Sequence, residues 1–124
     1  QWARQGKHYD LIVKGTNPLT EHFGALRANI PDNTNPETQL NTNLLNALGK
    51  FNTIYIAGEA KSHCVANTVK QLLEYSDIAS KIILLQDCMS DIPGTEHIAD
   101  SIYSEAENAG VVFKQSKDIN LKIK

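Results

Sequence analysis

The sequence predicts one α/β domain built on a mainly parallel sheet, and three observations favour this class. Short apolar runs alternate with segments of helical periodicity, as consecutive strand–helix–strand units require. One of these runs, Ile82 to Leu85, has four consecutive apolar residues, which is typical of a strand covered on both faces. The length of 124 residues suits a single domain with one core. We therefore expect a three-layer α/β/α domain over residues 1–124, with helices on both faces of the sheet.

The first half of the chain supplies two expected strands and one expected helix. Residues 11–13 (Leu-Ile-Val) form an apolar run that predicts a buried strand ending at Lys14. Residues 16–35 are rich in turn formers and predict a long loop, of the kind that often lines a site. Asn35 is expected to cap a helix that ends at Gly49 and has a face of leucines. The second strand is expected at 53–57, where Gly58 stops it.

The second half predicts two further helices and two further strands. Ser62 is expected to cap a helix that runs to about Tyr75. The strand at 82–85 ends at Gln86-Asp87, and a third helix opens at Gly94 or Thr95 and closes at Gly110. The residues of this helix that we expect to face the core are Ile98, Ala99, Ile102, Tyr103 and Ala106. The last strand is 111–113, and the lysine-rich tail over 116–124 is expected to fray.

Composition excludes several classes of function. The formal charge of −2 and the pI of about 6.1 leave no basic stripe for nucleic acid or for an anionic membrane. No apolar run approaches the roughly 20 residues that span a bilayer, and the first residues lack a signal peptide. Two cysteines are too few for a disulfide framework, which favours reduced thiols. We expect a cytoplasmic protein whose ligand is a small molecule.

The beginning of the chain is abrupt. Met89 is the single methionine, so Gln1 is not an initiator residue, and no cap or turn signature precedes the first strand. We expect that an N-terminal part has been removed or lies elsewhere. A cleaved tag or initiator is the simpler alternative.

Three positions are expected to share one edge of the sheet, because ligands of open parallel sheets bind at the carboxyl ends of the strands. Lys14 ends the first strand, residues 58–64 follow the second, and Asp87 follows the third. Cys64 falls in the first turn of the helix that Ser62 is expected to cap. There the free N–H groups and the helix dipole would stabilise a thiolate.

These residues carry a resemblance to a known family. The segment 58–68, Gly-Glu-Ala-Lys-Ser-His-Cys-Val-Ala-Asn-Thr, resembles the motif G-x-A-x-x-x-C-V-x-x-T of the cysteine hydrolases related to isochorismatase and nicotinamidase. Upstream, 13–15 (Val-Lys-Gly) and 22–25 (His-Phe-Gly-Ala) are similar to the family's lysine strand and the segment after it. The resemblance covers nearly the whole chain. It implies the isochorismatase-like, Rossmann-like fold, with the N-terminal strands absent from this chain.

The resemblance also implies a role for each matching residue. Cys64 would attack an amide carbonyl to form a thioester, and Lys14 would hold the thiolate by charge. The backbone N–H groups of Ala60 and Cys64 would form an oxyanion hole, worth about 3–4 kcal/mol per donor in the transition state. The family has a cis peptide before this alanine, here Glu59-Ala60. Glu59 and Phe23 are expected to contact the substrate, Phe23 by stacking on an aromatic ring; burial of Phe23 in the core is the alternative.

The chain departs from the family pattern before the lysine strand. The family's general base is an aspartate there, and its metal site, where present, combines an Asp-x-His cluster with further histidines. Only Asp10 and His8 precede Lys14 here, and neither matches. We therefore expect no metal or other cofactor in this chain, although a divalent metal such as zinc could belong to the complete protein. The chain alone is expected to be inactive unless an N-terminal segment of the same protein, or another copy, completes the sheet.

The residues beside the motif have simpler interpretations. His63 is expected at the edge of the site or in a cap, since neighbours on a helix point apart. Asp87 is expected to have a structural role, and Cys88 to pack. Hydrolysis of nicotinamide to nicotinate and ammonia is the best single prediction for the reaction. The alternatives are a family member that acts on isochorismate or on a carbamoyl compound, and a non-catalytic interaction domain with the same fold.

Overall fold

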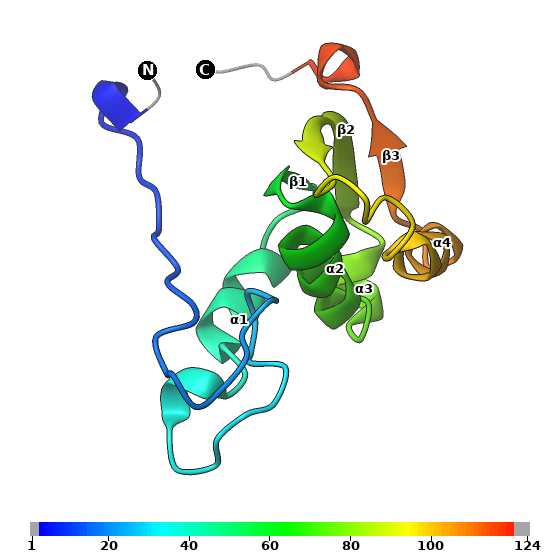
Figure 1. The fold of residues 1–124 in the computed structure, drawn as a ribbon. Helices are drawn as coiled ribbons and strands as arrows, with labels where there is room; N and C mark the ends of the chain where they lie inside the picture. Colours follow the sequence, from blue (N-terminus) through cyan, green and yellow to red (C-terminus); the bar gives the residue numbers. More distant parts are fainter. Residues whose placement is uncertain (1–2, 121–124) are drawn as a thin grey trace.

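The computed structural model describes residues 3–120 and shows an α/β fold around a three-stranded parallel sheet (Figure 1). The strands are β1 (Ile54–Glu59), β2 (Ile82–Ser90) and β3 (Val112–Lys114), in the order β1-β2-β3. Both neighbouring pairs are parallel. Each strand corresponds to one that the apolar runs predict. Across this range no helix is long and apolar enough to cross a bilayer.

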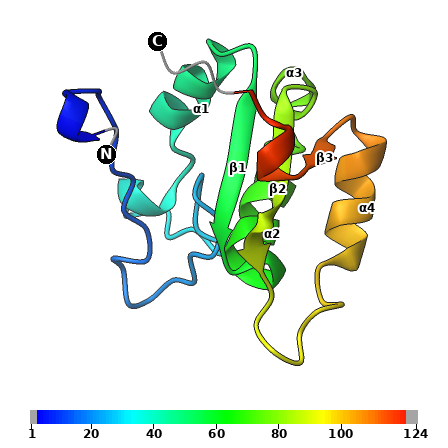
Figure 2. The same cartoon turned by 90° about the horizontal axis from the view of Figure 1, so that it is seen from above.

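The described range contains four α-helices, and all but the first lie on one face of the sheet. They are α1 (Thr42–Gly49), α2 (Ala66–Leu72), α3 (Ser76–Ala79) and α4 (Asp100–Asn108). Figure 1 shows α2, α3 and α4 on one side of the strands, and Figure 2 looks onto the other side. A helical layer on that second face, which we predicted, is not found within residues 3–120. The short helix α3 was not predicted.

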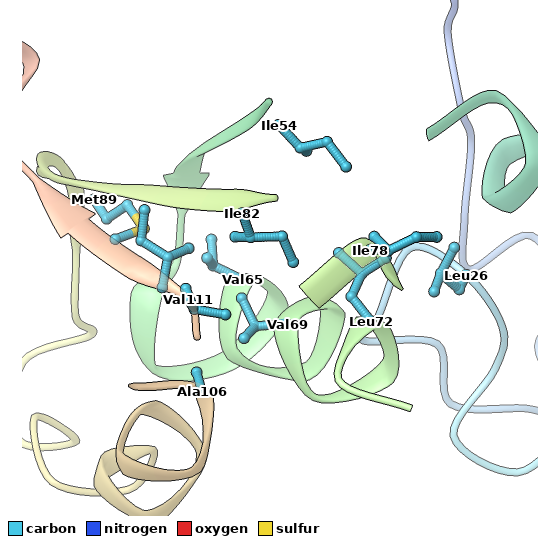
Figure 3. Packing of buried hydrophobic residues seen from close by; sticks show 11 residues of the cluster. Leu26, Ile54, Val65, Val69, Leu72, Ile78, Ile82, Met89, Ala106 and Val111 are labelled. Carbon is cyan, nitrogen blue, oxygen red and sulfur yellow. The ribbon is translucent and has the colours of Figure 1, made fainter. Parts of the chain in front are cut away.

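The core fills the space between the sheet and α2. Ile82 and Leu84 of β2 are fully buried, and Ile82 lies with Val65 and Val69 in the same cluster (Figure 3). Burial of a side chain of this size stabilises the fold by about 1.5–3 kcal/mol. Alternate residues of the strands point away from α2. Ile83 is therefore only half-buried, so β2 is not covered on both faces as its sequence predicts.

The pairing of β1 with β2 is irregular near the carboxyl ends of the strands. Ile56 pairs with Leu84, and the next pair is Gly58 with Met89, so β2 holds extra residues between them. Met89 is buried again after this bulge. The strand that we expected to end at Asp87 therefore continues to Ser90.

The expected strand at residues 11–13 is not formed. The segment has no regular structure, and the side chains of Leu11 and Val13 are 81% and 67% exposed. The sheet ends at β1 and the segment does not pair with it. A strand is stable only when its backbone groups pair with a neighbour, and this segment has none in the sheet.

Two of the expected helices begin later than predicted. Asn35 caps only a short turn, Pro36–Thr38; Gln39 is then extended, and Asn41 caps α1 with a hydrogen bond from Leu44 N. The third helix begins at Asp100, because residues 91–99 form turns instead. Ile98 consequently lies outside the helix and is 62% exposed, contrary to the prediction that it faces the core.

The start of the tail is fixed by the body of the protein. The N–H group of Ser116 donates to Asp87 Oδ1 at 2.7 Å, and its hydroxyl donates to the other carboxylate oxygen. The fraying that we predicted from residue 116 is therefore wrong for Ser116. The end of the tail, residues 121–124, lies outside the described residues, as do residues 1 and 2.

Candidate active site

A tight turn carries the candidate nucleophile. β1 ends at Glu59, the Glu59-Ala60 peptide is cis as predicted, and a π-helical turn over Lys61–Val65 leads into α2. The carbonyl of Ala60 accepts hydrogen bonds from the N–H groups of His63 and Val65, both at 3.1 Å. Gly58 has φ of +130°, a backbone conformation that glycine adopts at little cost. The turn places Cys64 just beyond the carboxyl end of β1.

Ser62 does not cap this helix, contrary to the prediction. The residue that precedes the turn is Ala60, which provides no side-chain cap, and Ser62 lies inside the turn with 2% of its surface exposed. Its hydroxyl bonds to the segment 92–95 instead. Cys64 is thus the fourth residue of a π-helical turn, and it precedes α2 rather than opening a regular helix.

Lys14 and Cys64 are in contact although fifty residues separate them in the sequence. The ammonium nitrogen of Lys14 lies 3.5 Å from the sulfur of Cys64, and it also donates to the carbonyl of His22 at 3.0 Å. Both side chains are partly buried. The structure therefore brings together the two residues that were predicted to form the catalytic pair.

Helix α2 fixes the loop whose His22 carbonyl binds Lys14. The N–H group of Ala25 donates to Thr68 Oγ1 at 3.0 Å, and the hydroxyl of Thr68 donates to the carbonyl of Cys64 at 2.8 Å. The buried amide of Gln71 accepts from Leu26 N at 3.0 Å and donates to the carbonyl of Arg27 at 2.9 Å. Sequence reasoning missed Gln71, since its partners lie more than forty residues away and no local signal marks them.

His22 also supports the site. From the sequence it was noted only as part of the family-like segment 22–25, with no role of its own. Its Nε2 atom is buried and has no hydrogen-bond partner in the described part of the chain. Burial lowers the pKa of His22 below its ordinary value, and the nearby charge of Lys14 lowers it further. The neutral imidazole is the form that this position favours.

A shallow depression of about 250 Å³ lies beside Cys64. The residues that line it come from β1, the turn, α2 and the loop: Ala25, Ile56, Ala57, Gly58, Glu59, Cys64, Val65 and Thr68. Glu59 is thus at the site as predicted, although its carboxylate also accepts a hydrogen bond from Ser90 Oγ at 2.8 Å. A larger cavity of about 420 Å³ between α4 and strands β2 and β3 includes Lys61 but not Cys64.

Phe23 lies at the surface beside the turn. Its side chain is 37% exposed, and its ring centroid is 6.5 Å from that of His63, at an interplanar angle of 51°. Core burial of Phe23, the alternative interpretation, is therefore wrong. The ring does not line the depression next to Cys64, so it stands at the edge of the site.

The third expected member of the site lies elsewhere. The carboxylate of Asp87 binds Ser116, and these hydrogen bonds lower the pKa of Asp87. These contacts are structural, as we favoured, because they join β2 to the start of the C-terminal tail, whereas Lys14 contacts His22 and Cys64. Cys88 is exposed and does not pack.

The described side chains do not suit a divalent metal. No group of three or more His, Cys, Asp and Glu residues within residues 3–120 could hold one. The zinc that the resemblance allows for the complete protein would need ligands from outside this set, since zinc sites use at least three protein ligands. No step of a mechanism for this chain is therefore assigned to a metal.

Comparisons with protein-family models, with curated proteins and with solved structures give no match for this chain. The features of the molecule that bear on function are the contact between Cys64 and Lys14 and the residues that position it.

Proposed function

We propose that this chain carries the nucleophile of a cysteine hydrolase that cleaves the C–N bond of a small amide. The observation that supports this most directly is the 3.5 Å contact between Lys14 Nζ and Cys64 Sγ. A neighbouring cation stabilises the thiolate, which is the reactive form of cysteine. The pair lies beyond the carboxyl end of a parallel strand, where ligands of such sheets bind. Nicotinamide, converted to nicotinate and ammonia, is the substrate that the resemblance to the nicotinamidase group favours.

The proposed reaction has two stages. The Cys64 thiolate attacks the carbonyl carbon, and the carbonyl electrons move to oxygen, which the N–H groups of Ala60 and Cys64 would stabilise. Collapse of this intermediate breaks the C–N bond, and the nitrogen leaves as ammonia after taking a proton. Water then attacks the thioester, the C–S bond breaks, and the acid is released. We assign both proton transfers to an aspartate outside this chain, as the resemblance implies.

Ammonia release tests the reaction. In the natural polypeptide that contains this chain, release from nicotinamide is expected to fall to the uncatalysed rate in Cys64→Ala, because the thioester cannot form. Cys88→Ala is the matched control, since this thiol is exposed and is not the one that Lys14 contacts, and it is expected to keep full activity. Undiminished turnover in Cys64→Ala would remove Cys64 from the mechanism.

The Cys64–Lys14 pair has a test that needs no substrate. Iodoacetamide reacts with the thiolate, so the rate of Cys64 alkylation at neutral pH is expected to fall about fivefold in Lys14→Met, the equivalent of about 1 kcal/mol for unit charges 4 Å apart in water. Cys88 provides an internal reference in the same sample, read by mass spectrometry of the two peptides. Lys50→Met removes a lysine at the far end of β1 and should change neither rate. Equal rates for Cys64 with and without Lys14 would contradict the proposed pair.

A panel of substrates separates the enzymatic alternatives. Nicotinamide, a carbamoyl compound and isochorismate differ in the bond that is broken, so the compound that gives a Cys64-dependent product identifies the group. Of the two residues proposed to contact the substrate, Phe23 is uncharged, whereas the carboxylate of Glu59 favours the neutral amide over the dicarboxylate isochorismate.

An interaction domain without catalysis is the second candidate function, and the bare face of the sheet favours it. Tyr55 and Val112 are 41% and 44% exposed, in the same row as the half-buried Ile83. Their partner would be an N-terminal segment of the same protein or another copy of the chain. An intact Cys64–Lys14 contact is not needed for such a role, so the alkylation experiment distinguishes the two candidates.

A further inference from the structure

A buried serine links the nucleophile's turn to the loop after β2. Ser62 Oγ is 2.9 Å from His63 Nδ1 and 3.0 Å from Thr95 Oγ1, and it accepts a hydrogen bond from Ile92 N at 3.2 Å. The hydroxyl of Thr95 also lies 2.7 Å from the carbonyl oxygen of Ile92. The four groups form a continuous chain from the imidazole of His63 to a backbone carbonyl.

The hydroxyl protons in this chain can be assigned, because each hydroxyl has only one. A carbonyl oxygen has no proton, so the 2.7 Å contact requires Thr95 to donate to Ile92. Thr95 Oγ1 is in position to donate to Ser62 Oγ as well, at 3.0 Å, but its one proton goes to the shorter contact with Ile92, so we assign the proton between the two hydroxyls to Ser62. The proton of Ser62 is then used as well. The remaining 2.9 Å contact is a hydrogen bond only if His63 Nδ1 carries a proton and donates to Ser62.

We propose that Ser62 and Thr95 hold neutral His63 as the tautomer that is protonated on Nδ1, and thereby leave its Nε2 atom as a hydrogen-bond acceptor. The two nitrogens are separated by Cε1 and their hydrogen-bonding directions diverge, so Nε2 does not face the buried serine that binds Nδ1. Within residues 3–120 no protein group donates to it. The ring of Phe23 lies beside the imidazole, at 6.5 Å between centroids. Ser62 and Thr95 are positioning residues, since they act through His63.

The tautomer gives the edge of the site a chemical preference, and this consequence rests on the proposed function. An unprotonated Nε2 accepts a hydrogen bond from the N–H₂ group of an amide, whereas its lone pair repels the oxygens of a carboxylate. His63 in this form favours the amide substrate over the acid product. A proton on Nε2 would reverse the preference.

The tautomer can be read directly from the chain by NMR. In protein with ¹⁵N-labelled histidine, the two ring nitrogens of His63 differ strongly in chemical shift according to which one carries the proton. The spectrum is recorded from pH 6 to 9 and read at its high-pH limit, and His63→Gln assigns the signals. We expect a protonated Nδ1 and a bare Nε2. The opposite assignment in the unmodified protein would overturn the proposal.

Thr95 provides the decisive variant. In Thr95→Val the proton of Ser62 has no hydroxyl to bond to, so Ser62 is expected to donate to Nδ1 and the proton of His63 to move to Nε2. Thr95→Ser keeps a hydroxyl and is expected to keep the original tautomer. An unchanged tautomer in a folded Thr95→Val protein, as judged by its amide spectrum, would contradict the assignment. None of these readings requires activity, so their failure is distinct from a failure to release ammonia.

Discussion

His22 supports the site through two different groups. Its carbonyl accepts the hydrogen bond from Lys14, and its ring is packed with the Nε2 atom buried and unpaired among the described residues. Burial and the charge of Lys14 both penalise the protonated ring, which lowers its pKa below the ordinary value of 6.5. The unfolded chain has no such penalty. Between the two pKa values the unfolded protein therefore binds more protons than the folded protein.

The fold is accordingly expected to lose stability as pH falls below 6.5. The loss should level off below the lowered pKa of His22, where both states are protonated. Urea unfolding midpoints between pH 8 and pH 5 measure it. His22→Gln should flatten this slope, whereas His97→Gln, which alters an exposed histidine, should leave it unchanged. A slope in His22→Gln equal to that of the unmodified protein would count against the assignment. Asp87 and Glu74 lose their stabilising contacts only at more acidic pH, below their ordinary pKa values of 3.8 and 4.5.

Single residues were predictable where their chemistry is local and unpredictable where their partners are distant. Lys14 and Cys64 were identified from two short motifs, and the structure places them in contact. Ser62 has the local pattern of a helix cap, but its hydroxyl bonds to Thr95, thirty-three residues later, inside a turn whose π-helical form the sequence does not reveal. No local sequence pattern predicts the burial of His22, because this burial depends on how the loop packs against α2.

At the scale of elements, α2 determines where the loop before α1 lies. The side-chain amide of Gln71 binds the loop as a neighbouring strand would: its oxygen accepts from the backbone N–H groups of Leu26 and Arg27, and its nitrogen donates to the carbonyl of Arg27. Gly24 lets the loop approach closely. A methyl group added there would lie 2.3 Å from Gln71 Oε1. The side chain of Gln71 is buried and hydrogen-bonded, so it cannot move aside without loss of these bonds.

Gly24→Ala is therefore expected to destabilise the fold by about 1–3 kcal/mol, as overpacking does in tight interiors. Gly49→Ala is the matched control, because nothing lies within 4 Å of the added methyl group and the residue is helical. It is expected to leave the free energy of unfolding unchanged or to raise it by up to about 1 kcal/mol. Urea denaturation of both variants measures the difference. Equal stabilities for the two would contradict the close packing at Gly24.

Elements were predictable where a periodic pattern and a neighbour coincide. The three strands were found from their apolar runs, because each has a strand beside it in the sheet. Residues 11–13 have the same pattern but no neighbour, and they form no strand. α4 starts at Asp100 rather than at Thr95, since the hydroxyl of Thr95 takes part in the turn with Ile92. Periodicity does not reveal such competition for hydrogen bonds.

At the scale of the molecule, two surfaces of the sheet are without cover among residues 3–120. β1 is an edge strand of the sheet, so its outer edge has no strand neighbour among these residues. The face away from α2, onto which Figure 2 looks, includes the row of neighbouring residues Tyr55, Ile83 and Val112. Open edges and contiguous apolar surface both favour association.

We expect the chain to associate through this face and edge, either with itself or with an N-terminal segment of the same protein. Size-exclusion chromatography with light scattering should give a mass above 13.7 kDa that rises with concentration. A lysine in the apolar row places a charge where the partner would pack, so Tyr55→Lys is expected to shift the chain toward the monomer. Ile98→Lys changes an exposed apolar residue away from the sheet, and it should leave the mass unchanged.

A stable pair buries about 1,200–2,000 Å² in total, so we expect the edge of β1 to contribute to the interface together with the exposed face of the sheet. A monodisperse 13.7 kDa species at every concentration would show that the exposed row does not mediate self-association.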